Sequence, residues 1–114
     1  MGRLTTHVLN TAHGVPAVGM AVRLMDASRI VIVETETNAD GRCDAPLLEG
    51  PTYKPGRYII AFSVAEYFRE HGAELSEPPF LDVVEIAFGL ADPNAHYHVP
   101  LLVSPWAYST YRGS

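Results

Sequence analysis

Polar and apolar residues alternate along most of this chain with a period of two, which is the repeat of a β-strand with one buried face. Glycine, proline, asparagine and aspartate interrupt the alternation at short intervals, so the strands between them are short. Short antiparallel strands joined by tight turns pack as two stacked sheets. The sequence therefore predicts an all-β fold, a two-sheet antiparallel sandwich of about eight strands with one short helix.

The predicted strands include residues 4–9, 19–26, 29–37, 57–63, 81–90, 96–103 and a last one from about 106 to the end. Asn38-Ala39-Asp40-Gly41 is predicted to be a hairpin turn, because the Asp-Gly pair tolerates positive φ, and this places Arg42 at the hairpin mouth. Ser63 to Glu66 has the spacing of a capping box, which predicts that the helix begins there and that Gly72 ends it.

The length of 114 residues predicts a single domain over residues 1–114 with one core. The net charge is −5 and no basic run occurs, so nucleic acid is not an expected partner. No apolar stretch approaches the ~20 residues that span a bilayer and no signal-peptide pattern is present, so we expect no membrane partner and a cytoplasmic location. Cys43 is the single cysteine, which leaves no internal disulfide and fits a reducing compartment.

His96 and His98 stand two residues apart on a predicted strand, so both rings project about 6.6 Å apart from the face opposite the core. Solvated surface histidines are the common interpretation, but Pro100 and Leu102 share that face and favour a subunit interface that forms one wall of a cleft. His7 lies on the outer side of its own strand and could join the pair. Three histidines could hold zinc, or could divide base and orienting roles without a metal, and the spacing does not separate these two readings.

Arg42 is by default a surface guanidinium, but its fork of donors could also stabilise an oxyanion or clamp a planar heterocycle. Cys43 beside it is more typical of a buried structural cysteine than of a nucleophile, so we leave it out of the chemistry. The last seven residues, 108–114, are polar and aromatic to the end of the chain. A plain edge strand is the simple interpretation, and a strand held in the sheet would let these residues line a site.

Three stretches of the sequence resemble the transthyretin-like 5-hydroxyisourate hydrolases. They are Leu4 to Asn10, Thr37 to Arg42, and the closing run from His96 to Ser114, which ends in Tyr-Arg-Gly-Ser. The closing tetrapeptide is the most specific of these, because hormone-carrying transthyretins resemble the hydrolases in fold but lack it. The resemblance covers essentially the whole chain, and it implies the two-sheet sandwich with one short helix that the periodicity also predicts.

The resemblance further implies a homotetramer, a dimer of dimers, with active sites in a central channel at the dimer interface. It implies cofactor-free hydrolysis of 5-hydroxyisourate, the product of urate oxidation in purine catabolism, to 2-oxo-4-hydroxy-4-carboxy-5-ureidoimidazoline. The positions that match the family's catalytic residues are His7, Arg42, His98 and Ser114, and those that match its substrate-binding residues are His96, Tyr111 and Arg112. We predict that one histidine of the His7 and His98 pair activates water as general base while Arg42 stabilises the oxyanion, with no metal.

Two alternatives stay open from the sequence. The same sandwich serves transthyretins as a small-molecule carrier without catalysis. The histidines and the terminal tetrapeptide favour the enzyme, because a carrier channel for an apolar hormone has no use for several titratable groups at one spot. A zinc enzyme ranks below the metal-free one, because no carboxylate or cysteine is placed to complete the coordination sphere.

Overall fold

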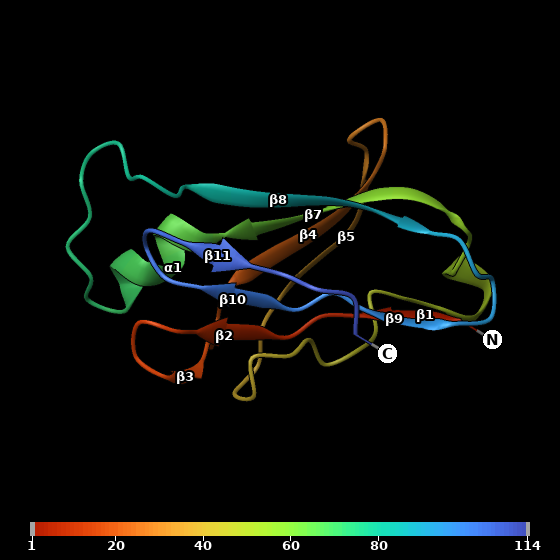
Figure 1. The fold of residues 1–114 in the computed structure, drawn as a ribbon, viewed down its shortest axis with the longest axis horizontal. Helices are drawn as coiled ribbons and strands as arrows, with labels where there is room; N and C mark the ends of the chain where they lie inside the picture. The colour runs from red at the N-terminus through yellow and green to blue at the C-terminus, as the bar shows by residue number, and fades with distance from the viewer. Residues whose placement is uncertain (1, 114) are drawn as a thin grey trace.

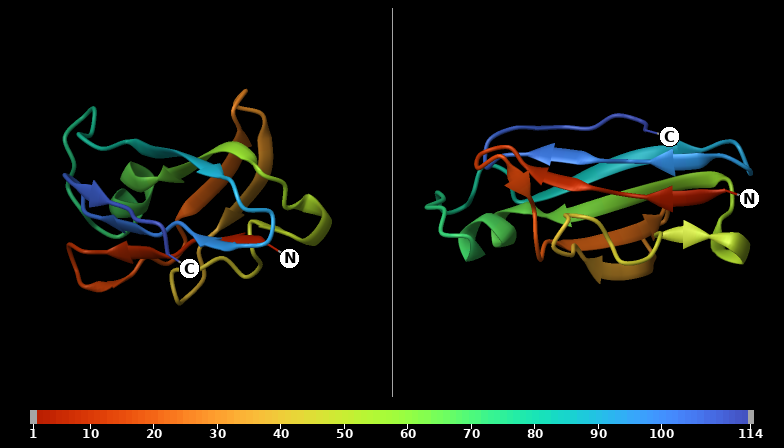
Figure 2. Two further views of the ribbon diagram at one scale, coloured as in Figure 1. Left: turned by 45° about the vertical axis from the view of Figure 1, so that its right-hand side comes forward. Right: turned by 90° about the horizontal axis from the view of Figure 1, so that it is seen from below.

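The computed structural model describes residues 2–113, in which the strands form two stacked layers (Figures 1 and 2). Within these residues there is one α-helix, α1 (Val64–Glu70), and one turn of 3-10 helix, η1 (Gly50–Thr52). No helix in this part of the chain has the length and apolar character needed to cross a bilayer. The predicted all-β sandwich with one short helix is confirmed.

One layer is a four-stranded sheet in the order β5-β4-β7-β8, with all neighbours antiparallel. Its strands fall within or close to four of the predicted ranges: β4 (Ala21–Asp26), β5 (Val31–Glu36), β7 (Gly56–Ser63) and β8 (Val83–Leu90). The alternation of β8 is as predicted, with Val84 and Leu90 buried and Ile86 and Phe88 packed against the core.

The other layer has two parts, in the orders β6-β1-β9 and β11-β10-β2-β3, which follow one another along the molecule (Figure 1). Its strands are β1 (Arg3–Thr5), β2 (Val8–Asn10), β3 (Val15–Pro16), β6 (Leu48–Glu49), β9 (His96–His98), β10 (Leu101–Val103) and β11 (Tyr108–Ser109). β1 runs parallel to β9, and β2 runs parallel to β10, so the prediction of antiparallel pairing is wrong for these two pairs. The two ends of the chain meet here after the intervening chain has built the other layer, and parallel neighbours need such a long connection.

The core lies between the layers and takes the inward side chains of each strand. Its fully buried members include Leu4, Val8, Val22, Leu24, Ile60, Phe62, Tyr67, Phe68, Leu101 and Val103. Burying one such aliphatic or aromatic side chain contributes about 1.5–3 kcal/mol, so the inward face of each strand is strongly specified. Since Leu4 and Val8 face inward, the alternation turns Arg3, Thr5 and His7 to the outer face.

The turn after β5 closes as predicted, but the chain that follows does not pair back along β5. The Oδ1 atom of Asn38 accepts the backbone N–H of Asp40 at 2.9 Å and that of Arg42 at 3.2 Å. Gly41 has φ of 77°, and a Cβ there would lie 2.4 Å from the carbonyl oxygen of Val8. Arg42 then forms an antiparallel bridge with His7, which belongs to the other layer. The prediction that Arg42 lies at the mouth of a hairpin is therefore wrong. The turn instead carries the chain across the sandwich.

α1 begins where the capping-box spacing predicts, but Ser63 forms no side-chain capping hydrogen bond. The N–H groups of Val64 and Ala65 instead donate to the carbonyl oxygen of Asp82, at 3.1 and 3.0 Å. The segment that leads into β8 therefore satisfies the start of the helix, and the hydroxyl of Ser63 is not needed for this.

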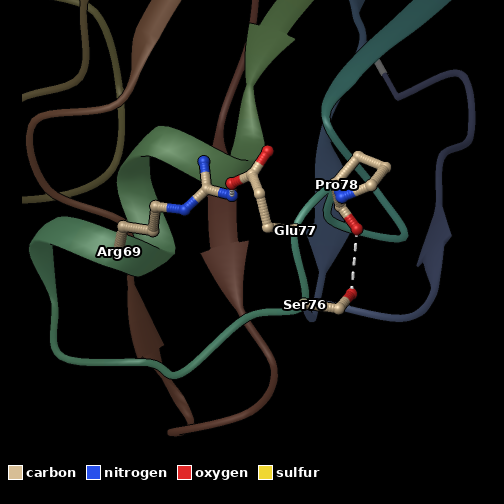
Figure 3. Close-up of polar contacts among 4 residues, drawn as sticks. All are labelled: Arg69, Ser76, Glu77 and Pro78. Atoms are coloured by element: carbon tan, nitrogen blue, oxygen red, sulfur yellow. Dashed lines mark hydrogen bonds and ion pairs between the residues drawn. The ribbon is translucent and has the colours of Figure 1, made fainter.

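The loop between α1 and β8 is tied back to the helix. Nη2 of Arg69 lies 3.0 Å from Oε2 of Glu77, and the hydroxyl of Ser76 donates to the carbonyl oxygen of Pro78 at 3.0 Å (Figure 3). In Figure 1 the helix and this loop lie at one end of the sandwich, and β1 and β9 lie at the other. The outer face described next is therefore remote from the helix.

Candidate active site

An open cleft of about 350 Å³ lies on the outer face of β1 and β9. Two neighbouring strands supply one wall, because β1 pairs with β9 in a register that sets Arg3 beside His96 and Thr5 beside His98. The segment after the Asn38–Gly41 turn, which runs beside β1, supplies the rest of the lining. The lining residues are Arg3, Thr5, Thr6, Arg42, Cys43, Ala45, His96 and His98.

The two histidines of β9 share one hydroxyl group. Oγ1 of Thr5 lies 2.7 Å from Nε2 of His96 and 2.8 Å from Nδ1 of His98. The ring centroids are 6.4 Å apart, close to the predicted spacing, and Tyr97 between them is buried. The prediction that both rings project from the outer face is confirmed.

Burial and neighbouring cations lower the pKa of both imidazoles. For His98 the pKa falls because of burial first, then because of the charges of Arg42, His7 and His96. For His96 it falls because of burial and then the charge of Arg3. Both rings are therefore neutral at neutral pH, and a neutral imidazole in a cleft is able to take a proton from water.

His7 and Arg42 are brought together by their backbone bridge, and the N–H of Val8 donates to the carbonyl oxygen of Gly41 at 2.8 Å. Nε2 of His7 donates to the carbonyl oxygen of Asp40 at 2.7 Å, since a carbonyl oxygen only accepts. This contact fixes the proton of neutral His7 on Nε2. The turn therefore positions both side chains that the sequence analysis pairs with His98.

Gly113 brings the end of the chain against His98. Their backbones form an antiparallel bridge, in which the N–H of Gly113 donates at 2.7 Å and that of His98 at 3.2 Å. A Cβ at position 113 would lie 3.1 Å from both Cβ and Cδ2 of His98. The glycine therefore packs directly against the edge of the imidazole. Ser114, which the sequence analysis includes among the catalytic residues, lies outside the described residues.

Tyr111 and Arg112 lie on the other side of β9 within this chain. The guanidinium of Arg112 stacks on the ring of Tyr97, 4.2 Å from its centroid. Both residues line a second cavity of about 260 Å³, whose other wall is β8. A single chain thus brings His7, Arg42, His96 and His98 together and holds Tyr111 and Arg112 apart from them.

Sequence reasoning missed Thr5 and Arg3 as lining residues. Thr5 shares the outer face with His7, but its contact with both histidines depends on the pairing of β1 with β9, which no local pattern reveals. Cys43 also lines the cleft, and burial together with the charge of Asp44 raises the pKa of its thiol. A raised thiol pKa disfavours the nucleophilic thiolate, in line with leaving Cys43 out of the chemistry.

The cleft combines neutral imidazoles with a guanidinium that carries only donors. Imidazoles can act as general bases, and a fixed guanidinium can stabilise an oxyanion. In the part of the chain that the structure describes, no three His, Cys, Asp or Glu side chains are grouped so that they could hold a metal ion. The geometry thus supplies groups for acid–base chemistry on a polar substrate.

The fold and the cleft define a small two-layer β-sandwich that carries imidazole and guanidinium groups in a cleft on one outer face. Comparison with known sequences shows which family within this class of fold the chain belongs to. The sequence model of the HIUase/Transthyretin family matches residues 4–113, and the chain belongs to that family. It is 56% identical over 117 residues to the 5-hydroxyisourate hydrolase of Ralstonia nicotianae, with both chains fully covered. It is 50% identical to that of Pseudomonas aeruginosa, with 100% of this chain and 93% of the relative covered.

Solved structures show the same relationship. A 5-hydroxyisourate hydrolase of Klebsiella pneumoniae superimposes with a TM-score of 0.83 at 32% identity, covering 100% of this chain and 94% of that one. An (S)-allantoin synthase superimposes with a TM-score of 0.94 at 44% identity over 99% of this chain, which spans only 44% of the synthase. Sea bream transthyretin, solved in complex with thyroxine, gives a TM-score of 0.84 at 27% identity, with 97% and 94% covered.

Proposed function

We propose that this chain hydrolyses 5-hydroxyisourate to 2-oxo-4-hydroxy-4-carboxy-5-ureidoimidazoline, a step of urate catabolism. The observation that carries the proposal is the cleft in which His98, with a lowered pKa, stands with Arg42 and beside His7. The full-length relatives at 50–56% identity that bear the hydrolase name support the choice of substrate.

The proposed mechanism needs no metal and no cofactor. A histidine of the His7 and His98 pair takes a proton from water as the water oxygen attacks the lactam carbonyl of the substrate. The carbonyl oxygen becomes an oxyanion, which Arg42 stabilises through its N–H donors. When the tetrahedral intermediate collapses, the ring C–N bond breaks and the protonated histidine returns the proton to the leaving nitrogen. The ring opens with the net addition of one water.

We also propose that the active unit is a homotetramer, a dimer of dimers, in the cytoplasm. The cleft lies open on an outer face, which leaves room for a second copy to cover it. Tyr108 and Tyr111, which are 46% and 60% exposed, offer aromatic surface to such a copy. In this assembly His96, Tyr111 and Arg112 would bind substrate and Ser114 would complete the catalytic set.

Single substitutions in the cleft test the proposal. We expect His7→Ala, His98→Ala and Arg42→Ala each to slow enzymatic ring opening by about 100-fold or more, because each removes a proton-transfer or oxyanion-stabilising group. The readout is the ultraviolet decay of freshly generated 5-hydroxyisourate, with circular dichroism to show that each variant is folded. Wild-type rates in all three folded variants would contradict the site assignment.

A small-molecule carrier is the second candidate, and the likeness to sea bream transthyretin in its thyroxine complex favours it. A carrier would bind iodinated phenols saturably and leave the spontaneous decay of 5-hydroxyisourate unchanged. Acceleration of that decay by the wild-type chain would decide for the enzyme, because uniform binding of a substrate without transition-state stabilisation gives no rate enhancement.

A further inference from the structure

We propose that Thr5 is a positioning residue that holds the proton of neutral His98 on Nδ1 and so leaves Nε2 bare as the base in the cleft. The part of this inference that concerns the reaction rests on the proposed function. The part that concerns the proton on the ring does not, because it follows from hydrogen bonding within the chain. Thr5 acts through His98 and is assigned no contact with substrate.

The inference begins with a count of donors and acceptors around one oxygen. A threonine hydroxyl has one proton to donate, and a neutral imidazole has one N–H and one bare nitrogen. Nε2 of His96 and Nδ1 of His98 both lie within hydrogen-bond distance of Oγ1 of Thr5, at 2.7 and 2.8 Å. The hydroxyl can donate to only one of them, so the other ring must carry its proton on the nitrogen that faces Thr5.

The charge beside His98 indicates that this ring is one that does so. Arg42 lines the cleft with His98, and its positive charge favours a lone pair rather than an N–H on the side of the ring that faces the cleft. With Nδ1 occupied by Thr5, the nitrogen left for the cleft is Nε2. His98 therefore donates its Nδ1–H to Thr5.

This arrangement also suits proton transfer. When Nε2 of His98 takes a proton from water, Nδ1–H continues to donate to Thr5, so no hydrogen bond has to be exchanged during the step. In the opposite arrangement Nε2 of His98 already carries its proton and cannot act as the base. Free histidine favours the proton on Nε2, so the protein must supply a contact that reverses this preference, and Thr5 is placed to do so.

Thr5 is held firmly enough for this role. β1 pairs with β6 on one side and β9 on the other, and the carbonyl oxygen of Thr5 accepts the N–H of Val99 at 2.9 Å. A β-branched side chain has few χ1 rotamers, so a fixed backbone also fixes the hydroxyl. The other titratable or charged groups around His98 are Arg3 on β1, His7 after it, Arg42 and Cys43 after the Asn38–Gly41 turn, and His96 on β9.

The direct test is the nitrogen chemical shifts of the imidazole rings in the full chain labelled with ¹⁵N-histidine, at a pH where His98 is neutral. We expect Nδ1 of His98 to carry the proton in the wild type and in Thr5→Ser, and the proton to move largely to Nε2 in Thr5→Val. A wild-type His98 with its proton on Nε2 would overturn the proposal. So would a Thr5→Val ring unchanged from the wild type.

Kinetics supply the second readout. We expect Thr5→Val to lower kcat for 5-hydroxyisourate by about 10-fold with little change in KM, which is the loss of one well-formed hydrogen bond in the transition state. Thr5→Ser should recover most of the rate, and Thr35→Val, the same change in β5 outside the cleft, should not alter it. Equal kcat in Thr5→Val and wild type would overturn the kinetic role. If the wild type fails to hydrolyse 5-hydroxyisourate, the proposed function fails, and the nitrogen shifts still decide the assignment of the proton.

Discussion

Gly113→Ala is the smallest change that reaches His98 without altering any group assigned to the chemistry. Gly113 is held in place by two backbone hydrogen bonds to His98, at 2.7 and 3.2 Å. An added methyl group would lie 3.1 Å from both Cβ and Cδ2 of the histidine. Carbon atoms in ordinary contact are about 3.5–4.0 Å apart, so the ring or the end of the chain must move by about 0.4 Å.

That displacement sets the expected loss of rate. A misplacement of about 1 Å in a catalytic group lowers the rate by about 100-fold. If the logarithm of the rate falls in proportion to the displacement, a shift of about 0.4 Å lowers kcat/KM about sixfold. The free energy of unfolding should change little, because the methyl group lies at the end of the chain and leaves the core side chains in place.

The assay is the ultraviolet decay of freshly generated 5-hydroxyisourate, compared between wild type, Gly113→Ala and a control, Gly89→Ala. At Gly89 an added Cβ has its nearest heavy atom, the carbonyl oxygen of Gly56, 4.0 Å away, so no shift is needed. Size-exclusion chromatography should show the same assembly for all three. A Gly113→Ala rate equal to that of the wild type, with the nitrogen shifts of His98 unchanged, would refute the contact between this glycine and the ring.

Three further predictions concern acid stability, metals and the end of the chain. Because the folded-state pKa values of His96 and His98 are lowered, the native state resists protonation. The free energy of unfolding, measured by urea denaturation, should therefore keep this contribution above the ordinary histidine pKa of about 6.5 and lose it as the pH falls through the lowered pKa values. The loss should be smaller in the His96→Gln, His98→Gln double variant. Dialysis against a chelator should leave the turnover of 5-hydroxyisourate unchanged, and added zinc should inhibit by occupying the imidazoles. Activity that is lost with chelator and restored by zinc would contradict the metal-free mechanism. Removal of residues 111–114, or an extension after them, should abolish most activity in a chain that circular dichroism shows to be folded. A tag before Met1 should be better tolerated. A fully active truncated chain would show that Arg112 and Ser114 do not belong to the site.

Period-two alternation was sufficient to predict which side chains face the core and which face out. It places Tyr97 inward and His96 and His98 outward, and it turns His7 away from the core, because a strand with one buried face cannot slip by one residue without exposing its apolar set. The Asp-Gly pair correctly marks a turn with positive φ at Gly41. These features depend on residues close together in the sequence.

Features that depend on long-range pairing could not be predicted in this way. The bond from Thr5 to both histidines spans more than ninety residues and requires β1 to run parallel to β9. The bridge of Arg42 with His7 replaces the expected hairpin for the same reason. The cap of α1 by Asp82 is another case, because the helix start is satisfied from outside its own segment. Alternation specifies a face, and it does not specify which strand lies beside which.

The central claim is that this chain accelerates the hydrolysis of 5-hydroxyisourate through the cleft of β1 and β9. The most direct test follows the ultraviolet decay of freshly generated 5-hydroxyisourate in large molar excess over the wild-type chain. We predict a rate proportional to protein concentration that continues over many turnovers, with His98→Ala close to the spontaneous rate. A decay no faster than the spontaneous reaction in the presence of folded wild-type protein would contradict the account.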